Sequence, residues 1–162
     1  MLPVHTILHP TDFSDRSQCA FDLACRLARE SGARLIILHV IQPPPFITHG
    51  EMAKALQQAE GYRRELNEKL HNLRCGDPTV AMEYRLKDGE PVAEILRAAT
   101  QSECDLIVLG THGRTGIRRL LLGSVAEQVL RRAGCPVLTV NTPLRESAML
   151  AFVQQRREGV TV

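Results

Sequence analysis

Short runs of apolar residues recur along the chain, and segments with helical periodicity lie between them. Residues 35–40 and 105–110 are the clearest of these runs, because almost every position in them is hydrophobic. A strand needs apolar residues on both of its faces when helices cover both sides of the sheet, as they do in parallel sheets. The alternation of such strands with helices therefore constrains the chain to the α/β class.

The boundaries of the elements follow from spacing and from capping residues. The predicted strands are 4–9, 35–40, 79–86, 105–110 and 136–140, and the predicted helices are 14–31, 51–73, one starting at Pro91, and 124–133. Ser14 or Asp15 is positioned to cap the first helix, and Gly32 and Gly134 to end the first and the last. The prediction is one open, doubly wound, five-stranded parallel sheet with helices on both faces.

Length, charge and hydropathy exclude several classes of protein. A chain of 162 residues favours one domain. Its 20 Lys and Arg against 18 Asp and Glu leave a net charge of +2, which is small for a general nucleic-acid binder. No apolar stretch is long enough to cross a bilayer, and the first residues lack the pattern of a signal peptide. We expect a cytoplasmic protein with neither a membrane nor a nucleic-acid partner.

The cysteines follow no recognisable framework. They are Cys19, Cys25, Cys75, Cys104 and Cys135, with no CxxC spacing among them. An odd number at irregular spacing is atypical of a disulfide scaffold or a zinc site. We therefore predict buried thiols in a reducing cytoplasm, where cysteine packs as a small hydrophobic residue.

Polar and glycine residues follow three of the predicted strands. Pro10, Thr11 and Asp12 come directly after the first strand, Val40 ends the second, and Gly110 ends the fourth. Ligands of open α/β sheets bind beyond the carboxyl ends of the strands, where the strand order reverses. We expect these segments to meet in one crevice, provided that the first and fourth strands are neighbours.

The segment after the fourth strand is rich in glycine and arginine. It contains Gly110, Gly113, Arg114, Gly116, Arg118 and Arg119, and it leads to Gly123 and Ser124 at the start of a helix. Glycines let backbone N–H groups approach an anion, and a helix N-terminus adds partial positive charge. This order of features favours a phosphate site, although a plain glycine turn has the same spacing.

Ser124 has two interpretations, and the sequence leaves both open. With Glu127 it fits a capping box, and its hydroxyl is also placed to bind phosphate. Other phosphate and hydrolase motifs are absent, namely GxxxxGK[ST], GxGxxG after the first strand, and GxSxG. A P-loop NTPase, a dinucleotide enzyme and an α/β-hydrolase are therefore disfavoured.

The pattern Gly110-x2-Gly113-x9-Gly123-Ser124 resembles the nucleotide-binding signature of the universal stress proteins. Residues 7–14 are similar to the first strand and loop of that family, 38–40 to the end of its second strand, and 134–137 to the entry into its last strand. The likeness extends from about residue 4 to residue 141. Four landmarks in the family's order are specific, whereas one glycine spacing would be weak.

The resemblance implies the strand order 3-2-1-4-5 and the ATP-binding branch of the family, with ATP and Mg²⁺ as the ligand and AMP as the alternative nucleotide. It implies that Asp12 lies near the ribose or adenine, that the Val40 backbone meets the adenine, and that the signature residues hold ribose and phosphates. The full expected set is Pro10, Thr11, Asp12, Val40, Gly110, His112, Gly113, Arg114, Gly123, Ser124 and Val125. No catalytic residue and no metal ligand is predicted.

The resemblance also implies a homodimer that pairs through the last strand, Val137, Leu138, Thr139 and Val140. Residues 1–141 then form the nucleotide-binding domain. Residues 142–162 are a C-terminal tail, either a short amphipathic helix or a loosely docked segment, and no role transfers to them.

His9 departs from the family pattern, which has an aliphatic residue at this position. We expect it to be a hydrogen-bonded polar neighbour of the site. The alternatives are a metal site shared with Asp12 and titration near neutral pH. His39 is expected to make a local hydrogen bond at its strand end.

Three functions remain open at this point. The first is an ATP-binding regulator of the stress response that senses the nucleotide. The second is a slow ATP hydrolase or a self-phosphorylating enzyme, with Ser124 or Thr115 as acceptor, although no strong catalytic constellation is visible. The third is a nucleotide-free dimeric interaction module.

Overall fold

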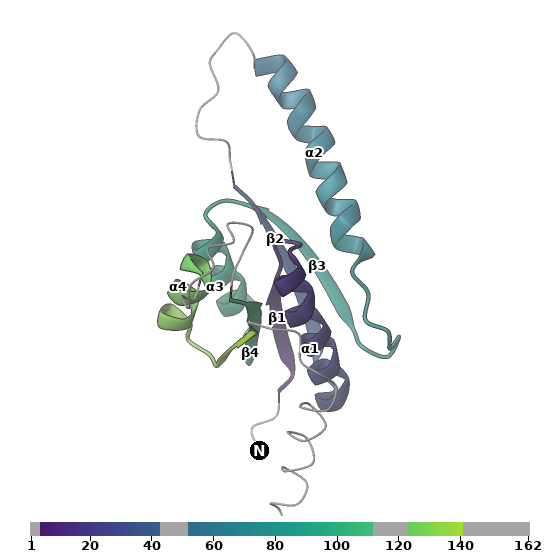
Figure 1. Ribbon diagram of the computed structural model, residues 1–162, viewed down its shortest axis with the longest axis vertical. Coiled ribbons are helices and arrows are strands. Elements are labelled where there is room, and N and C mark those ends of the chain that lie inside the picture. Colours follow the sequence, from purple (N-terminus) through teal and green to yellow (C-terminus); the bar gives the residue numbers. More distant parts are fainter. Residues whose placement is uncertain (1–3, 43–51, 112–122, 141–162) are drawn as a thin grey trace, which may run out of the picture.

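A computed structural model describes residues 4–42, 52–111 and 123–140 of the chain. These residues contain a parallel sheet of five strands, β1 (Thr6–Pro10), β2 (Arg34–Ile41), β3 (Met82–Asp88), β4 (Leu106–Gly110) and β5 (Val137–Val140). The strand order is β3-β2-β1-β4-β5, and Figure 1 labels β3, β2, β1 and β4 of this sheet. The predicted fold class and strand order are therefore confirmed, and β1 and β4 are neighbours as the site prediction requires.

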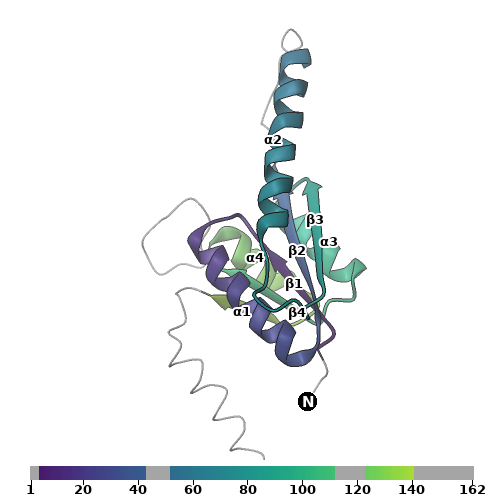
Figure 2. The same ribbon diagram turned by 90° about the vertical axis from the view of Figure 1, so that its right-hand side faces the viewer.

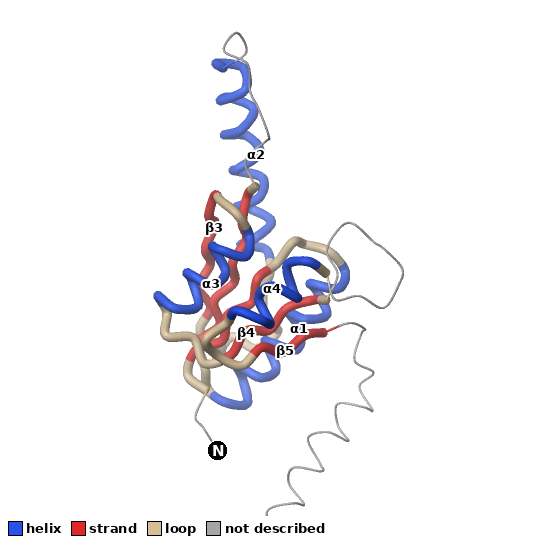
Figure 3. Tube along the Cα trace, turned by 90° about the vertical axis from the view of Figure 1, so that its left-hand side faces the viewer, coloured by secondary structure: helices blue, strands red, loops and turns tan. Residues whose placement is uncertain are grey.

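Helices cover both faces of the sheet. They are α1 (Asp15–Ser31), α2 (Met52–Asn72), α3 (Pro91–Gln101) and α4 (Ser124–Arg132). Figure 2 shows α1 and α2 in front of the sheet, and Figure 3 shows α3 and α4 on the opposite face. The first half of α2 extends beyond the sheet in both views. None of the helices among the described residues has the length and apolarity to cross a membrane.

Alternate residues of the central strands enter two separate cores. Ile7 and Val108 pack with Phe21 and its neighbours on α1. Leu8 and Ile107 pack with residues of α3 and α4 on the other face. Because successive side chains of a strand point to opposite faces, burial on both sides requires the uninterrupted apolar runs found in the sequence.

Most of the predicted helix ends are confirmed. The Ser14 hydroxyl caps α1 by accepting from the Ser17 N–H, and Gly32 ends the helix with φ +71°, a conformation that glycine adopts without steric cost. Pro91 stands in the first turn of α3, where the Glu90 carboxylate accepts from the Val92 and Ala93 N–H groups. Local capping chemistry therefore sets these boundaries.

The helix α4 begins at Ser124 as predicted and ends at Arg132, one residue before the predicted end, but Gly134 does not close it as predicted. Gly123 is the N-cap residue, and no side chain among the described residues caps the helix. Ser124 therefore lies inside the first turn, and the capping box with Glu127, one of its two open interpretations, is not formed. At the other end Ala133 leaves the helix in an extended conformation, and Gly134 has no left-handed role. The chain continues almost directly into β5, so an extended residue serves better here than a left-handed one.

The third strand begins later than predicted, at Met82 instead of residue 79. The Asp77 carboxylate accepts hydrogen bonds from the Thr79 N–H at 2.9 Å and from the Thr79 hydroxyl at 2.6 Å. Such Asx turns compete with strand pairing. The turn includes Thr79 and Val80, the first two residues that the alternating pattern assigned to the strand.

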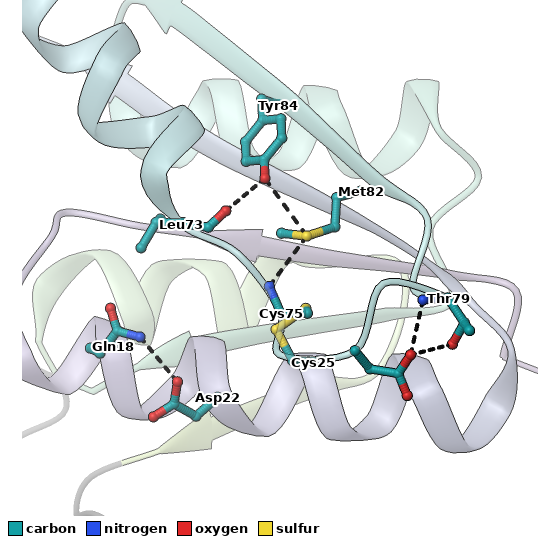
Figure 4. The surroundings of a disulfide bond; sticks show 9 residues. Gln18, Asp22, Cys25, Leu73, Cys75, Thr79, Met82 and Tyr84 are labelled. Carbon is teal, nitrogen blue, oxygen red and sulfur yellow. Dashed lines mark hydrogen bonds between the residues drawn. A yellow bond between two sulfur atoms is a disulfide. The ribbon is translucent and has the colours of Figure 1, made fainter.

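The prediction that all cysteines are free thiols is wrong for two of them. Cys25 of α1 and Cys75 of the α2–β3 connection form a disulfide with their Cα atoms 5.5 Å apart (Figure 4). The two residues are 50 positions apart, and only the packing of α1 against the segment entering β3 brings them together. Among the described residues, Cys19, Cys104 and Cys135 are thiols, but only Cys104 is buried as predicted, whereas Cys19 and Cys135 are half-buried.

Removing the crosslink should destabilise the fold. Closing a loop between residues 50 positions apart is worth about 4 kcal/mol in the chain-entropy account, and losses of roughly 2–5 kcal/mol are typical. We expect Cys25→Ala/Cys75→Ala to lose about 2–4 kcal/mol of unfolding free energy in urea titrations. Dithiothreitol should bring the unsubstituted chain to the same stability and leave the double variant unchanged. An oxidised chain no more stable than the variant would contradict this expectation.

Candidate functional site

A cavity of about 530 Å³ lies beyond the carboxyl ends of β1, β2 and β4. We call it the switch-point pocket, because β1 and β4 flank the place where the strand order reverses. Its lining residues come from strand ends, from the first turn of α4 and from parts of α1, α2 and α3. They are Pro10, Thr11, Asp12, Ser17, Leu38, His39, Val40, Ile41, Gln42, Tyr62, Pro91, Ile95, Leu109, Gly110, Thr111, Gly123, Ser124, Val125 and Ala126.

The loop after β1 is held rigidly at the edge of this pocket. The Thr11 N–H donates to the Leu38 carbonyl at 2.8 Å, and the Ser17 hydroxyl donates to Thr11 Oγ1 at 2.9 Å. His39 Nδ1 bonds the Thr11 carbonyl at 2.7 Å, which is the local hydrogen bond predicted for this histidine. Because a carbonyl can only accept, Nδ1 carries the proton. Thr11 is thereby fastened to both β2 and α1.

Asp12 takes part in the same loop structure. Its Oδ1 accepts from the Ser14 N–H at 3.0 Å and from the Ser14 hydroxyl at 2.6 Å. Phe13 follows with φ +61°, an uncommon conformation for a residue with a side chain, and its ring lies 4.5 Å from that of His39. These bonds orient the half-buried Asp12 carboxylate at the wall of the pocket before any ligand arrives.

Gly110 is required at the end of β4 by packing. A Cβ at this position would come within 3.0 Å of the Arg16 carbonyl group and 3.1 Å of the Ser17 nitrogen. Both neighbours are backbone atoms at the start of α1, which cannot move away without shifting the helix. Packing alone therefore requires glycine at position 110, independently of the anion-binding role predicted for it.

The first turn of α4 faces the pocket with its N-terminal end. Gly123, Ser124 and Val125 line the cavity, and the Gly123 N–H donates to the Thr111 carbonyl. The Ser124 side chain is exposed and makes no cap bond. The N–H groups of a first helical turn have no partner within the helix, and they carry the positive end of its dipole. This end of the pocket is suited to an anion.

Eight of the predicted site residues lie in the described part of the chain, and all eight line the switch-point pocket. They are Pro10, Thr11, Asp12, Val40, Gly110, Gly123, Ser124 and Val125. His112, Gly113 and Arg114 lie outside the described residues. That these residues contact a nucleotide stays a prediction.

Sequence reasoning missed several residues of the pocket wall. Ser17, Tyr62 and Ile95 lie on three different helices, and none of them belongs to a recognisable motif. His39, Ile41 and Thr111 did carry a usable signal, because each stands at or just after the end of a predicted strand. The helical contributions depend on how α1, α2 and α3 pack on the sheet.

His9 lies beneath the loop and does not line the pocket. It is fully buried, its Nδ1 donates to the Val108 carbonyl at 2.9 Å, and its Nε2 finds no hydrogen-bond partner among the residues that the structure describes. Burial lowers the pKa of His9 to about 4, against the opposing effects of the Val108 carbonyl and of Asp12. The prediction that His9 titrates near neutral pH is therefore wrong. The predicted hydrogen bonding is confirmed for Nδ1 but not for Nε2.

A shared metal site with Asp12 is not supported either. Asp12 lines the pocket, whereas His9 is buried in the core and does not. Within residues 4–42, 52–111 and 123–140, no group of three or more metal-binding side chains occurs. His9 is best described as a neutral core residue.

The buried imidazole should make the fold sensitive to acid. Its folded-state pKa lies below the unfolded value of 6.5, so its contribution is complete above pH 6.5 and is lost as the pH falls toward 4. A shift of this size corresponds to about 3 kcal/mol. We expect His9→Leu to show a weaker fall in unfolding free energy between pH 7 and pH 4.5 than the unsubstituted chain. Identical pH slopes for the two chains would refute the assignment.

Comparison with known proteins finds relatives across most of the chain. The sequence profile of the universal stress protein family matches residues 3–141. Universal stress protein MJ0531 of Methanocaldococcus jannaschii is 37% identical over 145 residues, which cover 86% of this chain and 84% of that protein.

Solved structures agree with this match. Universal stress protein UspA from Lactobacillus plantarum has a TM-score of 0.72 at 26% identity, with 87% of this chain and 100% of that chain covered. A universal stress protein in complex with cAMP has a TM-score of 0.56 at 30% identity, with 86% and 98% covered. The profile spans most of the sequence, and the strand order is the one expected for it, so this chain belongs to the universal stress protein family.

Proposed function

We propose that the chain binds an adenine nucleotide, ATP with Mg²⁺, in the switch-point pocket and acts as a nucleotide-sensing regulator in the stress response. One observation carries the proposal. Apolar walls and an uncapped helix N-terminus line the same cavity of about 530 Å³. Small-molecule pockets usually measure about 300–1,000 Å³ and combine apolar walls with a few placed polar groups.

The two kinds of lining match the two ends of a nucleotide. Val40, Ile41 and Ile95 provide apolar surface for a base. Ser124 and the N–H groups of the first turn of α4 provide donors and positive potential for phosphates. Asp12, oriented by Ser14, lies between the strand ends as an acceptor for ribose hydroxyls. Its carboxylate is also the kind of ligand that suits a Mg²⁺ ion carried by the phosphates.

The comparisons support a nucleotide of this class. The relative with 30% identity was solved in complex with cAMP, which contains adenine, ribose and one phosphate. The choice of ATP rests on the glycine signature, whose members Gly110, Gly123 and Ser124 line the pocket and whose member Gly113 lies outside the described residues.

The lining residues favour binding over turnover. Asp12 is the one carboxylate among the described residues of the pocket, and its Oδ1 already accepts two bonds from Ser14. A hydrolase needs a base placed to activate water. The described wall offers no second acidic group for that step, so we propose a sensing role.

Ser124→Ala tests the phosphate end of the site. The hydroxyl makes no cap bond, so its loss leaves α4 intact. One charge-assisted hydrogen bond corresponds to about a tenfold change in affinity. We expect Ser124→Ala to bind Mg-ATP about tenfold more weakly in calorimetry, and adenosine within about twofold of the unsubstituted chain.

Ser31→Ala, at the far end of α1, is the matched control and should leave both affinities unchanged. A folded chain that binds neither Mg-ATP nor AMP would overturn the nucleotide proposal. An equal loss for ATP and adenosine in Ser124→Ala would refute the phosphate role of this residue.

A second proposal concerns the open edge of the sheet. We propose that two copies of the chain pair through β5, which among the described strands is bonded only to β4. Leu138 on this strand is 37% exposed, and Leu130 on the neighbouring α4 is 48% exposed. Pairing would cover both the apolar side chains and the unpaired backbone groups of the edge.

Leu138→Lys tests the dimer. A charge at the centre of a paired edge is costly to bury, so we expect the variant to run as a monomer in size-exclusion chromatography with light scattering, where the unsubstituted chain is dimeric. Tyr62→Lys replaces a similarly exposed apolar residue on α2 and should keep the dimer. A monomeric unsubstituted chain at micromolar concentration would contradict the proposal.

A further inference from the structure

A second cavity, of about 580 Å³, opens beside the disulfide on the α1 side of the molecule. We call it the disulfide cavity. Its residues come from α1 and from the α2–β3 connection. They are Phe21, Asp22, Cys25, Arg26, Arg29, Arg74, Cys75, Gly76, Asp77 and Pro78. Both sulfur-bearing residues are half-buried, so the crosslink forms part of the cavity wall.

The charged residues that line the cavity are three arginines and two aspartates, and Arg29 also pairs with Glu30 at 4.0 Å. Arg26 and Arg29 lie on α1, and Arg74 directly precedes Cys75. Asp22 accepts from the Gln18 amide at 3.0 Å, and Asp77 accepts twice from Thr79. The wall thus carries a net positive charge together with acceptors. A small molecule with two carboxylates and one ammonium group complements it better than a neutral or a purely cationic one.

The crosslink also restrains the base of α2. Leu66 and Leu70 are the buried side chains of this helix among its described residues, and Arg63 pairs with Asp88 of β3. The Tyr84 hydroxyl donates to the Leu73 carbonyl at 2.6 Å, just beyond the end of the helix. Cys75 follows two residues later and ties the connection to α1 (Figure 4). Opening this bond removes the covalent restraint on the helix that carries Tyr62 to the switch-point pocket.

We propose that the Cys25–Cys75 disulfide is a thiol–disulfide exchange site for a small anionic thiol of the glutathione class, which docks among Arg26, Arg29 and Arg74 in the disulfide cavity. Nothing in this proposal depends on nucleotide binding. The site makes the crosslink responsive to the ratio of reduced to oxidised thiol around the protein.

The exchange is balanced with two thiols. The thiolate of the first attacks one sulfur of the disulfide, the S–S bond breaks, and a mixed disulfide forms while the other cysteine leaves as a thiolate and takes up a proton. The thiolate of the second attacks the mixed disulfide and releases the remaining cysteine and the oxidised thiol dimer. The two cysteines gain two electrons, which the two small thiols lose, and the oxidised dimer drives the reverse reaction.

The experiment compares thiols of different charge on the full chain. Air-oxidised protein is incubated with glutathione, 2-mercaptoethanol or cysteamine at equal thiolate concentration. The reaction is quenched with an alkylating reagent, and peptide mass spectrometry measures the opening of Cys25–Cys75. Each rate is divided by the rate of the same thiol with a small neutral disulfide, which removes differences in intrinsic reactivity.

We expect the normalised rate for glutathione to exceed that for cysteamine by about 3–10-fold at low ionic strength, and the gap to close in about 0.5 M salt. Arg74→Glu should remove or invert the preference. Arg132→Glu, which makes the same charge change on α4 at the opposite face of the sheet, should keep it.

Two results would overturn the proposal. One is equal normalised rates for the three thiols on the unsubstituted chain, a comparison that needs no variant to fold. The other is alkylation of both Cys25 and Cys75 in air-oxidised protein without any thiol, which would show that the crosslink does not form. A preference that Arg74→Glu and Arg132→Glu retain equally would also count against the cavity as its source.

Discussion

Burial of β1 on both faces is the constraint on which the rest of the structure depends. Ile7 and Leu8 are fully buried toward opposite layers, and β1 lies between β2 and β4 at the centre of the sheet. A parallel strand in this position needs helices on both sides, so the connections must cross to one face and then to the other. The reversal of strand order beside β1 follows, and it leaves the strand ends open where the switch-point pocket lies.

The wall of the switch-point pocket is held in place by bonds within the chain itself. The loop after β1 is bonded to β2 through Thr11 and to α1 through Ser17, and Gly110 lets α1 approach β4 closely. The polar groups at the end of the pocket therefore stand on rigid elements, which reduces the ordering that binding requires. In the proposed nucleotide site the N-terminus of α4, which no described side chain caps, would complement this wall, because a side-chain cap would occupy the donors that an anion needs.

The two faces of the sheet differ in how their helices are held. On one face, α3 and α4 pack through continuous apolar contacts with β1, β2 and β4. On the other, α1 packs firmly, whereas the described part of α2 buries only Leu66 and Leu70 and projects past the sheet. The disulfide compensates for this weak attachment by joining the connection after α2 to α1. The buried, half-satisfied His9 lies under the same α1 layer and ties the stability of the core to pH.

The sequence by itself determined the α/β class, the caps of α1 and the strand ends that form the pocket. Burial on both faces and helix capping each constrain the residue types within a short stretch of sequence, so they can be predicted from it. The resemblance to a family supplied the strand order, which no local pattern contains. Only the tertiary structure decided the Cys25–Cys75 pairing, the place of Tyr62 in the pocket wall, the packing reason for Gly110 and the unpaired Nε2 of His9. Each of these features depends on which distant segments come into contact. The spacing of residues along a single helix or strand does not indicate those contacts.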